Sequence, residues 1–346
     1  MKQRLTIILC CLPVLLAILL LVGTKSKTFG KKLLAEQGPN NISYGDLYGM
    51  CGLPEFKFPI PVVDFNSTST LEEAGTITLG DSFFQAKFES KGLPDLLADN
   101  LKKTVFDPHE IIGNPLVYLA QHHYQKTKSK TIVVETIERY AAKRAASYDE
   151  KIIVDDSTTT KQNFKKTIND AAYEIFDQTD LNYFFKHNLL INPLRIFIND
   201  LEFKTLGLVN DNIGRYSITP PMLFYSEEVD FDTDQHVTDN IDILAQKIKW
   251  LGDTLKEKYN LDMIYVVIPN KYTVYNYLDK NGSYNNFIPE LQTRLEKEKV
   301  NYVDLYTPYM NYVKNPNAPL LYYPNETHYS AVGKNILVQE LMKKIK

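Results

Sequence analysis

A serine near the start of the chain and a histidine near its end could together carry out nucleophilic catalysis. Ser82 lies in the run Gly80-Asp81-Ser82, directly after a stretch typical of a β-strand. His328 follows Glu326 by two positions. A serine hydroxyl, an imidazole and a group that orients the imidazole are the parts of an acyl-transferring triad. The sequence therefore predicts acyl transfer in which Ser82 attacks, His328 takes its proton and Glu326 stabilises the imidazolium.

The residues around Ser82 predict a strand-to-helix corner. Apolar and polar residues alternate over 76–79, and Gly80 allows backbone conformations that other residues resist. The apolar residues after the serine could line one side of a helix: Phe83, Phe84 and Phe88. At such a corner the Ser82 N–H lies at a helix N-terminus, where unpaired donors can stabilise negative charge on a substrate oxygen. Asp81 is a further candidate for the oxyanion or substrate site, although Asp81 or Ser82 could instead only cap the helix.

His328 is predicted to lie on a loop between a strand end and a helix. Residues 320–323 are typical of a strand end, and a Pro-Asn turn follows them. Ser330 can cap a helix over about residues 331–345, in which apolar residues recur at helical spacing. A loop in this position allows an imidazole to point into a cleft.

The order and separation of Ser82 and His328 resemble those of the SGNH (or GDSL-type) hydrolase superfamily. There the nucleophile lies in a Gly-Asp-Ser block near the start of the domain and the histidine in a block near its end. Residues 323–333 are similar to the Asp-Thr-His-Trp-Asn-x-x-Gly block of the alginate O-acetyltransferase-like branch, as are residues 133–140 and 267–272. The resemblance covers about residues 75–145 and 240–346.

The resemblance also implies an acid two residues before the histidine, which is Glu326 here. Members of the superfamily usually have Asp, whereas this chain offers Asn325 and Glu326. Glutamate can still accept the imidazole N–H and favour its cationic form. Asn325, the alternative acid position, could orient the ring but could not offset its charge, so we favour Glu326.

The superfamily usually completes its oxyanion site with a glycine N–H and an asparagine side chain. Asn270 follows the apolar run 263–268, which is typical of a buried parallel strand, and open α/β sheets place their sites at that strand end. Asn270 is therefore our candidate donor, with an ordinary turn residue as the alternative. Arg139 follows another β-like run and could hold a substrate carboxylate, but an ion pair within the fold is favoured.

Alternating helix and strand patterns after residue 240 predict a parallel sheet with helices on both faces. The expected helices and strands are residues 247–259, 263–268, 287–299 and 301–306. With the resemblance, this predicts a three-layer α/β/α SGNH-like domain over residues 71–346. A large, mostly helical insertion is expected at about residues 145–235, which could cover the site, bind a glycan or only pack.

The first residues predict attachment to a membrane. Leu5–Val22 is a run of 18 residues without a charge, which as a helix nearly matches the hydrocarbon thickness of a bilayer. We expect residues 1–23 to form a signal anchor, with a cleaved signal peptide as the alternative, and residues 24–70 to form a linker and an irregular approach to the first strand. The positive-inside count argues for the opposite orientation, but long domains cross largely regardless of charge, so an extracytoplasmic domain is expected. Cys51 is the sole thiol beyond the anchor, which excludes an intramolecular disulfide there.

These features together predict a membrane-anchored serine O-acyltransferase, transferring an acetyl group in the simplest case, that acts on a polysaccharide or other cell-envelope glycan. The resemblance implies an acyl donor, a glycan acceptor and a membrane-bound O-acyltransferase as partners, without a cofactor or a metal ion. The net charge of −3 does not favour nucleic-acid binding. A carbohydrate esterase or deacetylase with the same triad, and a non-catalytic glycan-binding or assembly protein, are the alternatives. A Ser82 hydroxyl within hydrogen-bond reach of His328 would argue against the non-catalytic protein.

Overall fold

The computed structural model describes residues 42–63, 69–85, 88–108, 111–126, 130–148 and 192–345. By its internal contacts the chain divides into two units. The larger unit comprises Ile42–Cys51, Glu55–Asp155 and Asn210–Lys346, and it contains every candidate site residue named above. The described part of the smaller unit comprises Gly52–Pro54 and residues 192–209.

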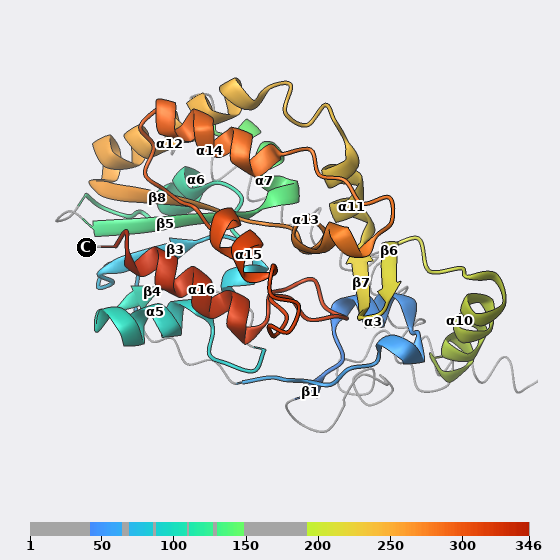
Figure 1. Ribbon diagram of the computed structural model, residues 1–346. Helices are drawn as coiled ribbons and strands as arrows, with labels where there is room; N and C mark the ends of the chain where they lie inside the picture. Colours follow the sequence, from blue (N-terminus) through green and yellow to red (C-terminus); the bar gives the residue numbers. More distant parts are fainter. Residues whose placement is uncertain are drawn as a thin grey trace, which may run out of the picture. The chain divides into compact units, whose positions relative to one another are not determined.

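The larger unit is built on a five-stranded sheet in which every neighbouring pair of strands is parallel. Figure 1 shows this sheet with helices above and below it. The strands, in their order across the sheet, are β4 (Val105–Phe106), β3 (Thr76–Leu79), β5 (Lys130–Ile137), β8 (Leu261–Ile268) and β9 (Tyr302–Val303). The expected α/β fold with a parallel sheet is confirmed.

Alternate strand residues pack against opposite helical layers. On β5, Ile132 and Val134 enter one hydrophobic cluster and Val133 the other, as the two-residue period of a strand requires. The first cluster includes helices α6 (Pro115–Gln121), α7 (Glu138–Ala146), α12 (Ile241–Tyr259) and α14 (Phe287–Lys297). The second includes α5 (Leu93–Leu101), α15 (Tyr306–Tyr312) and α16 (Ala331–Met342). Burial on both faces explains the nearly continuous apolar sequence of β8 and the apolar run 132–134 within β5.

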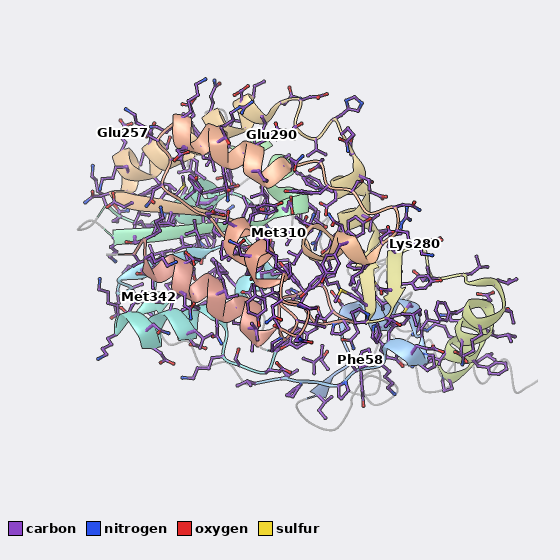
Figure 2. All side chains as sticks on the ribbon, in the orientation of Figure 1. Phe58, Glu257, Lys280, Glu290, Met310 and Met342 are labelled. Atoms are coloured by element: carbon purple, nitrogen blue, oxygen red, sulfur yellow. The ribbon has the colours of Figure 1, made fainter. Side chains whose placement is uncertain are left out.

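The outer face of α12 carries charged residues, whereas some charged residues of other helices are buried. Glu257 on α12 is exposed and lies at the rim of the molecule in Figure 2. Several expected boundaries differ from those observed. The helix predicted from residue 247 begins at Ile241, and the strand predicted over 301–306 is only Tyr302–Val303, because α15 begins at Tyr306. Residues 320–323 form no strand; Tyr322 makes a single bridge with Tyr329.

The region expected to be a mostly helical insertion is of mixed structure where it is described. Residues 149–191, a large part of the expected insertion, lie outside the described residues. The remainder comprises α10 (Asn192–Leu206), a hairpin of β6 (Ile213–Ile218) and β7 (Pro221–Tyr225), and α11 (Ser226–Thr233). The hairpin and α11 belong to the larger unit, whereas α10 belongs to the smaller one.

The segment before β3 contains short elements where it is described. These are β1 (Ile42–Ser43), α3 (Asp46–Cys51), η1 (Pro54–Phe56) and β2 (Ile60–Pro61), which pairs with β1. The predicted anchor, residues 1–23, lies outside the described residues. Within the described ranges, no helix has both the length and the apolar character needed to cross a bilayer. Cys51 is buried and forms no disulfide bond with another described residue.

Candidate active site

Ser82 lies where the winding direction of the sheet reverses. It is the first residue of α4 (Ser82–Gln85), and two residues, Gly80 and Asp81, separate it from the end of β3. The next strand along the chain, β4, lies on one side of β3, and the following strand, β5, lies on the other. Open α/β sheets bind ligands at the carboxyl ends of the strands that flank such a reversal. The fold therefore places Ser82 where a site is expected.

Gly80 is required at this corner by a close approach of another side chain. A Cβ on Gly80 would lie 2.3 Å from Glu135 Oε2, and that same oxygen accepts the Asp81 N–H at 2.7 Å. Gly80 is not among the residues with a positive φ, so the unusual backbone conformation expected from the sequence is not the reason for the glycine. Space for Glu135 is the reason.

Asp81 stabilises the strand-to-helix corner, in agreement with the alternative that it caps the helix. Its carboxylate accepts the Phe83 N–H at 3.0 Å and the Ile137 N–H at 2.9 Å, and it lies 3.5 Å from the Arg144 guanidinium. These contacts join the start of α4 to the end of β5. The Ser82 N–H has no hydrogen-bond partner in the described part of the chain, as expected in the first turn of a helix.

The triad expected from the sequence is assembled by hydrogen bonds. His328 Nε2 lies 2.8 Å from Ser82 Oγ, and His328 Nδ1 lies 2.6 Å from Glu326 Oε1. Only 4% of the Glu326 side chain and 16% of the His328 side chain are exposed, so the base can be reached while the acid cannot. The Phe83 ring packs against the imidazole at a centroid distance of 4.7 Å. The Ser82 hydroxyl therefore lies within hydrogen-bond reach of His328, the geometry that was expected to argue against a non-catalytic protein.

The electrostatics favour an ionised acid and a basic imidazole. Burial alone would raise the pKa of Glu326, but hydrogen bonds from His328 and from the Asp46 N–H lower it below its usual value. Burial alone would lower the pKa of His328, but its hydrogen bond and charge interaction with Glu326 raise it. An ionised Glu326 accepts the proton of Nδ1–H, which assigns the tautomer and leaves Nε2 to accept the Ser82 proton.

Asn325 is not the residue that orients His328. Its side-chain Nδ2 donates to the backbone oxygens of Tyr44 at 2.7 Å and Phe58 at 2.8 Å. It therefore ties the histidine loop to the segment before β3. Of the two candidate acid positions, the structure brings only Glu326 to the imidazole.

The two candidates for substrate binding are engaged within the fold. The Asn270 side chain is fully buried, donates to Asp232 Oδ1 at 2.9 Å and accepts the Arg139 N–H at 3.3 Å. The amide group is therefore not placed to donate to an oxyanion, because the side chain is fully buried and one of its N–H groups bonds a carboxylate on α11 that the sequence alone could not pair with it. Arg139 forms a buried ion pair with Glu228 at 2.8 Å, which is the alternative that the sequence favoured.

Lys271 is a buried cation that the sequence analysis overlooked. Its ammonium group donates to the backbone oxygens of Glu326 at 2.9 Å, Tyr323 at 3.2 Å and Pro324 at 3.5 Å. Burial lowers its pKa to about 8. The available signal in the sequence was the position of Lys271 just after the mostly apolar run 261–268. A lysine that is buried at such a place needs hydrogen-bond acceptors around its ammonium group.

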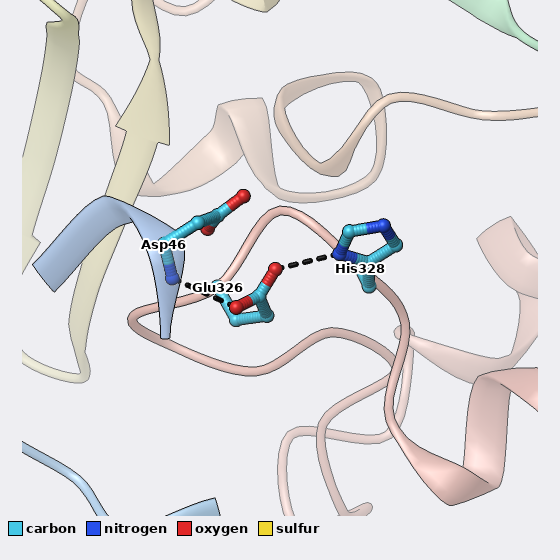
Figure 3. Close-up of side chains that lie close together, drawn as sticks. All are labelled: Asp46, Glu326 and His328. Carbon is cyan, nitrogen blue, oxygen red and sulfur yellow. Dashed lines mark hydrogen bonds and ion pairs between the residues drawn. The ribbon is translucent and has the colours of Figure 1, made fainter. Parts of the chain in front are cut away.

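Asp46 was also overlooked, since it lies 280 residues from Glu326 in the sequence. Figure 3 shows the Asp46 N–H directed at one oxygen of Glu326 while the other oxygen contacts His328. Ligand atoms of Asp46, Glu326 and His328 lie within 4.8 Å of one another, close enough in principle to surround a cation. Hydrogen bonds within the protein engage the imidazole Nδ1 and both carboxylates, which supports a triad rather than a metal centre.

Comparisons of this chain with protein-family models, with curated proteins and with solved structures find no match.

Proposed function

We propose that this protein is an SGNH-like serine O-acyltransferase, membrane-anchored with its catalytic domain outside the cytoplasm, that acylates a polysaccharide or other cell-envelope glycan. The hydrogen-bonded chain from Ser82 through His328 to Glu326, at the reversal point of a parallel sheet, is the observation that carries the proposal. The anchor and the acceptor rest on the sequence of residues 1–23 and on the resemblance to acetyltransferases.

In the first half of the reaction, the acyl group moves to the enzyme. Ser82 Oγ forms a bond to the acyl carbon of the donor while its proton passes to His328 Nε2. The donor's leaving group then departs with that proton. Glu326 stabilises the imidazolium through Nδ1–H, and the Ser82 N–H is available for the negative charge on the acyl oxygen.

In the second half, a sugar hydroxyl replaces the leaving group. His328 takes the proton of that hydroxyl, its oxygen bonds to the acyl carbon, and the ester bond to Ser82 breaks. The proton returns to Ser82 Oγ. Water in place of the sugar would give the esterase alternative, so transfer requires that the site bind an acceptor and exclude water.

The test is acylation of the full chain, purified in detergent, by p-nitrophenyl acetate. We expect one acetyl group on Ser82 by intact-mass spectrometry and peptide mapping. Ser82→Ala and His328→Ala should lower the acylation rate by about 10⁴-fold or more. Ser69→Ala, which removes a hydroxyl that contacts only a neighbouring backbone oxygen, is the matched control.

Two outcomes would end the proposal as stated. Unchanged acylation in folded Ser82→Ala would show that Ser82 is not the nucleophile. A folded wild-type chain that is never acylated would favour the glycan-binding alternative. If acylation does occur, adding an oligosaccharide acceptor distinguishes transfer from hydrolysis, because transfer yields an acylated sugar at the expense of free acetate.

A further inference from the structure

The segment before β3 interlocks with the loop that carries the catalytic acid and base. We name Tyr44–Tyr48 the strap. The Tyr48 N–H donates to the Asn325 oxygen at 3.2 Å, and Asn325 Nδ2 donates back to the Tyr44 oxygen. Gly45 lies between them with a φ of +81°, and a Cβ there would lie 2.1 Å from the Asn325 oxygen. Both the backbone conformation and the close approach therefore require glycine in the strap.

Asp46 makes the central contacts of the strap through its backbone and its side chain. Its N–H donates to Glu326 Oε2 at 2.8 Å. Its carboxylate accepts the Thr327 N–H at 2.8 Å and the Thr327 hydroxyl at 2.5 Å. One residue thus contacts the catalytic acid and the residue between that acid and His328.

We propose that Asp46 is a positioning residue of the active site, which holds Glu326 in the orientation that aligns His328 with Ser82. The carboxylate of Asp46 clamps Thr327, and this clamp fixes the Asp46 N–H opposite Glu326 Oε2. Glu326 then has a partner for each oxygen and cannot rotate without losing one of them. This inference rests on the proposed function, because positioning matters only if the triad acts.

Asp46 also contributes negative charge near the base. The acidic groups that interact with His328 include Glu326, Asp46 and Asp81, each of which raises the pKa of the imidazole, and the buried Glu228. Burial, followed by the charge of Glu326, raises the pKa of Asp46 itself to about 6. Removing the Asp46 carboxylate should therefore have two effects: a looser triad, and a base that becomes active at lower pH.

The experiment measures acylation by p-nitrophenyl acetate against pH in Asp46→Ala, Asp46→Asn and Thr327→Val. We expect Asp46→Ala to lower kcat by about 10- to 100-fold, the cost of misplacing catalytic groups, while KM changes little. Asp46→Asn retains an acceptor for Thr327 and should recover most of kcat, but both variants should shift the pH profile of kcat/KM downward. Thr327→Val removes only the hydroxyl and should lower kcat less than Asp46→Ala does.

Asp242→Ala is the matched control, since Asp242 also lies in the first turn of a helix but pairs with Arg294 on α14. A kcat and pH profile in Asp46→Ala equal to those of Asp242→Ala would overturn the inference. If Asp46→Ala does not fold, the same comparison is made with Asp46→Asn and Thr327→Val, and wild-type values in both would overturn it.

A readout that needs no activity separates this inference from the proposed function. The proton shared by His328 Nδ1 and Glu326 should give a low-field NMR signal in wild type and in Ser82→Ala. The signal should shift or broaden in Asp46→Ala. If it does so while the wild type cannot be acylated, the proposed function fails but the positioning contact stands. If the enzyme is acylated and the signal is unchanged in Asp46→Ala, only the positioning role fails.

Discussion

The serine and the histidine of this site are held by different means. Ser82 begins a helix at the end of β3, which is paired on both sides, and Asp81 bonds both the first turn of that helix and the end of the neighbouring strand β5. His328 lies on a loop, residues 323–330, whose only regular pairing is the bridge between Tyr322 and Tyr329. The nucleophile is therefore placed by secondary structure, whereas the base and its acid are placed by tertiary contacts.

Those contacts reach the loop from three separate parts of the chain. Lys271, after β8, donates to three of its backbone oxygens. The Leu223 N–H on β7 donates to the Pro324 oxygen at 2.8 Å, and Asp46 contacts Glu326 and Thr327. A loop held in this way is sensitive to distant substitutions. We expect that changes far from His328 will impair catalysis more than comparable changes around β3.

The largest effect is expected from the acid itself. Glu326→Gln keeps the size of the side chain but offers no negative charge to the imidazolium and can donate where His328 Nδ1–H needs an acceptor. The acylation rate should fall by about 10³- to 10⁴-fold, as expected when a triad histidine is left in the wrong tautomer. The measurement is the rate of Ser82 acylation per folded molecule.

Asn325→Ala gives the contrasting result within the same loop. It removes the two hydrogen bonds to Tyr44 and Phe58, so we expect a loss of about 1–3 kcal/mol in the free energy of unfolding. Acylation should fall by less than about 10-fold, because the imidazole keeps its acid. Equal losses of acylation in Glu326→Gln and Asn325→Ala would show that the wrong residue was assigned as the acid.

A second pair of substitutions compares the two regions directly. Lys271→Met leaves buried carbonyl oxygens of the histidine loop without a donor, so the free energy of unfolding should fall by about 2–4 kcal/mol. Acylation should slow by about 10-fold or more as the loop loosens. Thr78→Val is the counterpart on β3, where the hydroxyl donates to the Phe106 oxygen at 2.8 Å.

Thr78→Val should lower the free energy of unfolding by about 1 kcal/mol and leave the acylation rate of folded molecules unchanged, because strand pairing still positions the corner. Denaturant unfolding and single-turnover acylation give the two values for each variant. The proposed difference between the Ser82 corner and the histidine loop is wrong if Thr78→Val loses as much acylation rate per kcal/mol of lost unfolding free energy as Lys271→Met does.

The same difference explains what the sequence could and could not predict. The strand over 76–79, the corner at Ser82 and the helix capped by Ser330 all depend on residues within a few positions of one another, and all three are observed. The contacts of Asp46 with the histidine loop span about 280 residues, and those of Lys271 span more than 50. No pattern among residues that are close together in the sequence indicates such distant hydrogen-bond partners.

Asn270 is a residue whose position could be predicted from the sequence although its hydrogen-bond partner could not. Its place at the end of β8 was predicted, but a polar residue at a strand end does not reveal its own partner. Asp232 on α11 takes its amide group, and α11 lies in a region of the sequence expected to be an insertion. A position can thus be predicted from the order of strands while the role of the side chain depends on a distant helix.

A last effect, on stability alone, is expected from pH, acting on Glu138 at the end of the strand that pairs with β3. This carboxyl accepts hydrogen bonds from the Asn270 N–H and from the Thr273 and Tyr284 hydroxyls. Burial raises its pKa from 4.5 to about 7. Between those values the folded protein keeps a proton that the unfolded chain releases, so the free energy of unfolding falls as pH rises through this window.

We expect Glu138 to contribute a decrease of about 2 kcal/mol between about pH 5 and pH 7.5, measured by denaturant unfolding as the difference between wild type and Glu138→Gln. The carboxyls of Asp46, Glu135, Glu228 and Asp232 also have pKa values raised by burial and act in the same direction in both proteins. The raised pKa of His328 acts in the same direction above its usual value of 6.5, whereas the lowered pKa of Glu326 acts only below 4.5. Glu138→Gln should therefore flatten the slope between pH 5 and 6.5, where the histidine contributes least, and Glu257→Gln on the exposed face of α12 controls for the substitution itself. A slope unchanged by Glu138→Gln would mean that the carboxyl is already ionised near pH 5 in the folded protein, and that the end of β5, like the histidine loop, is held by charge.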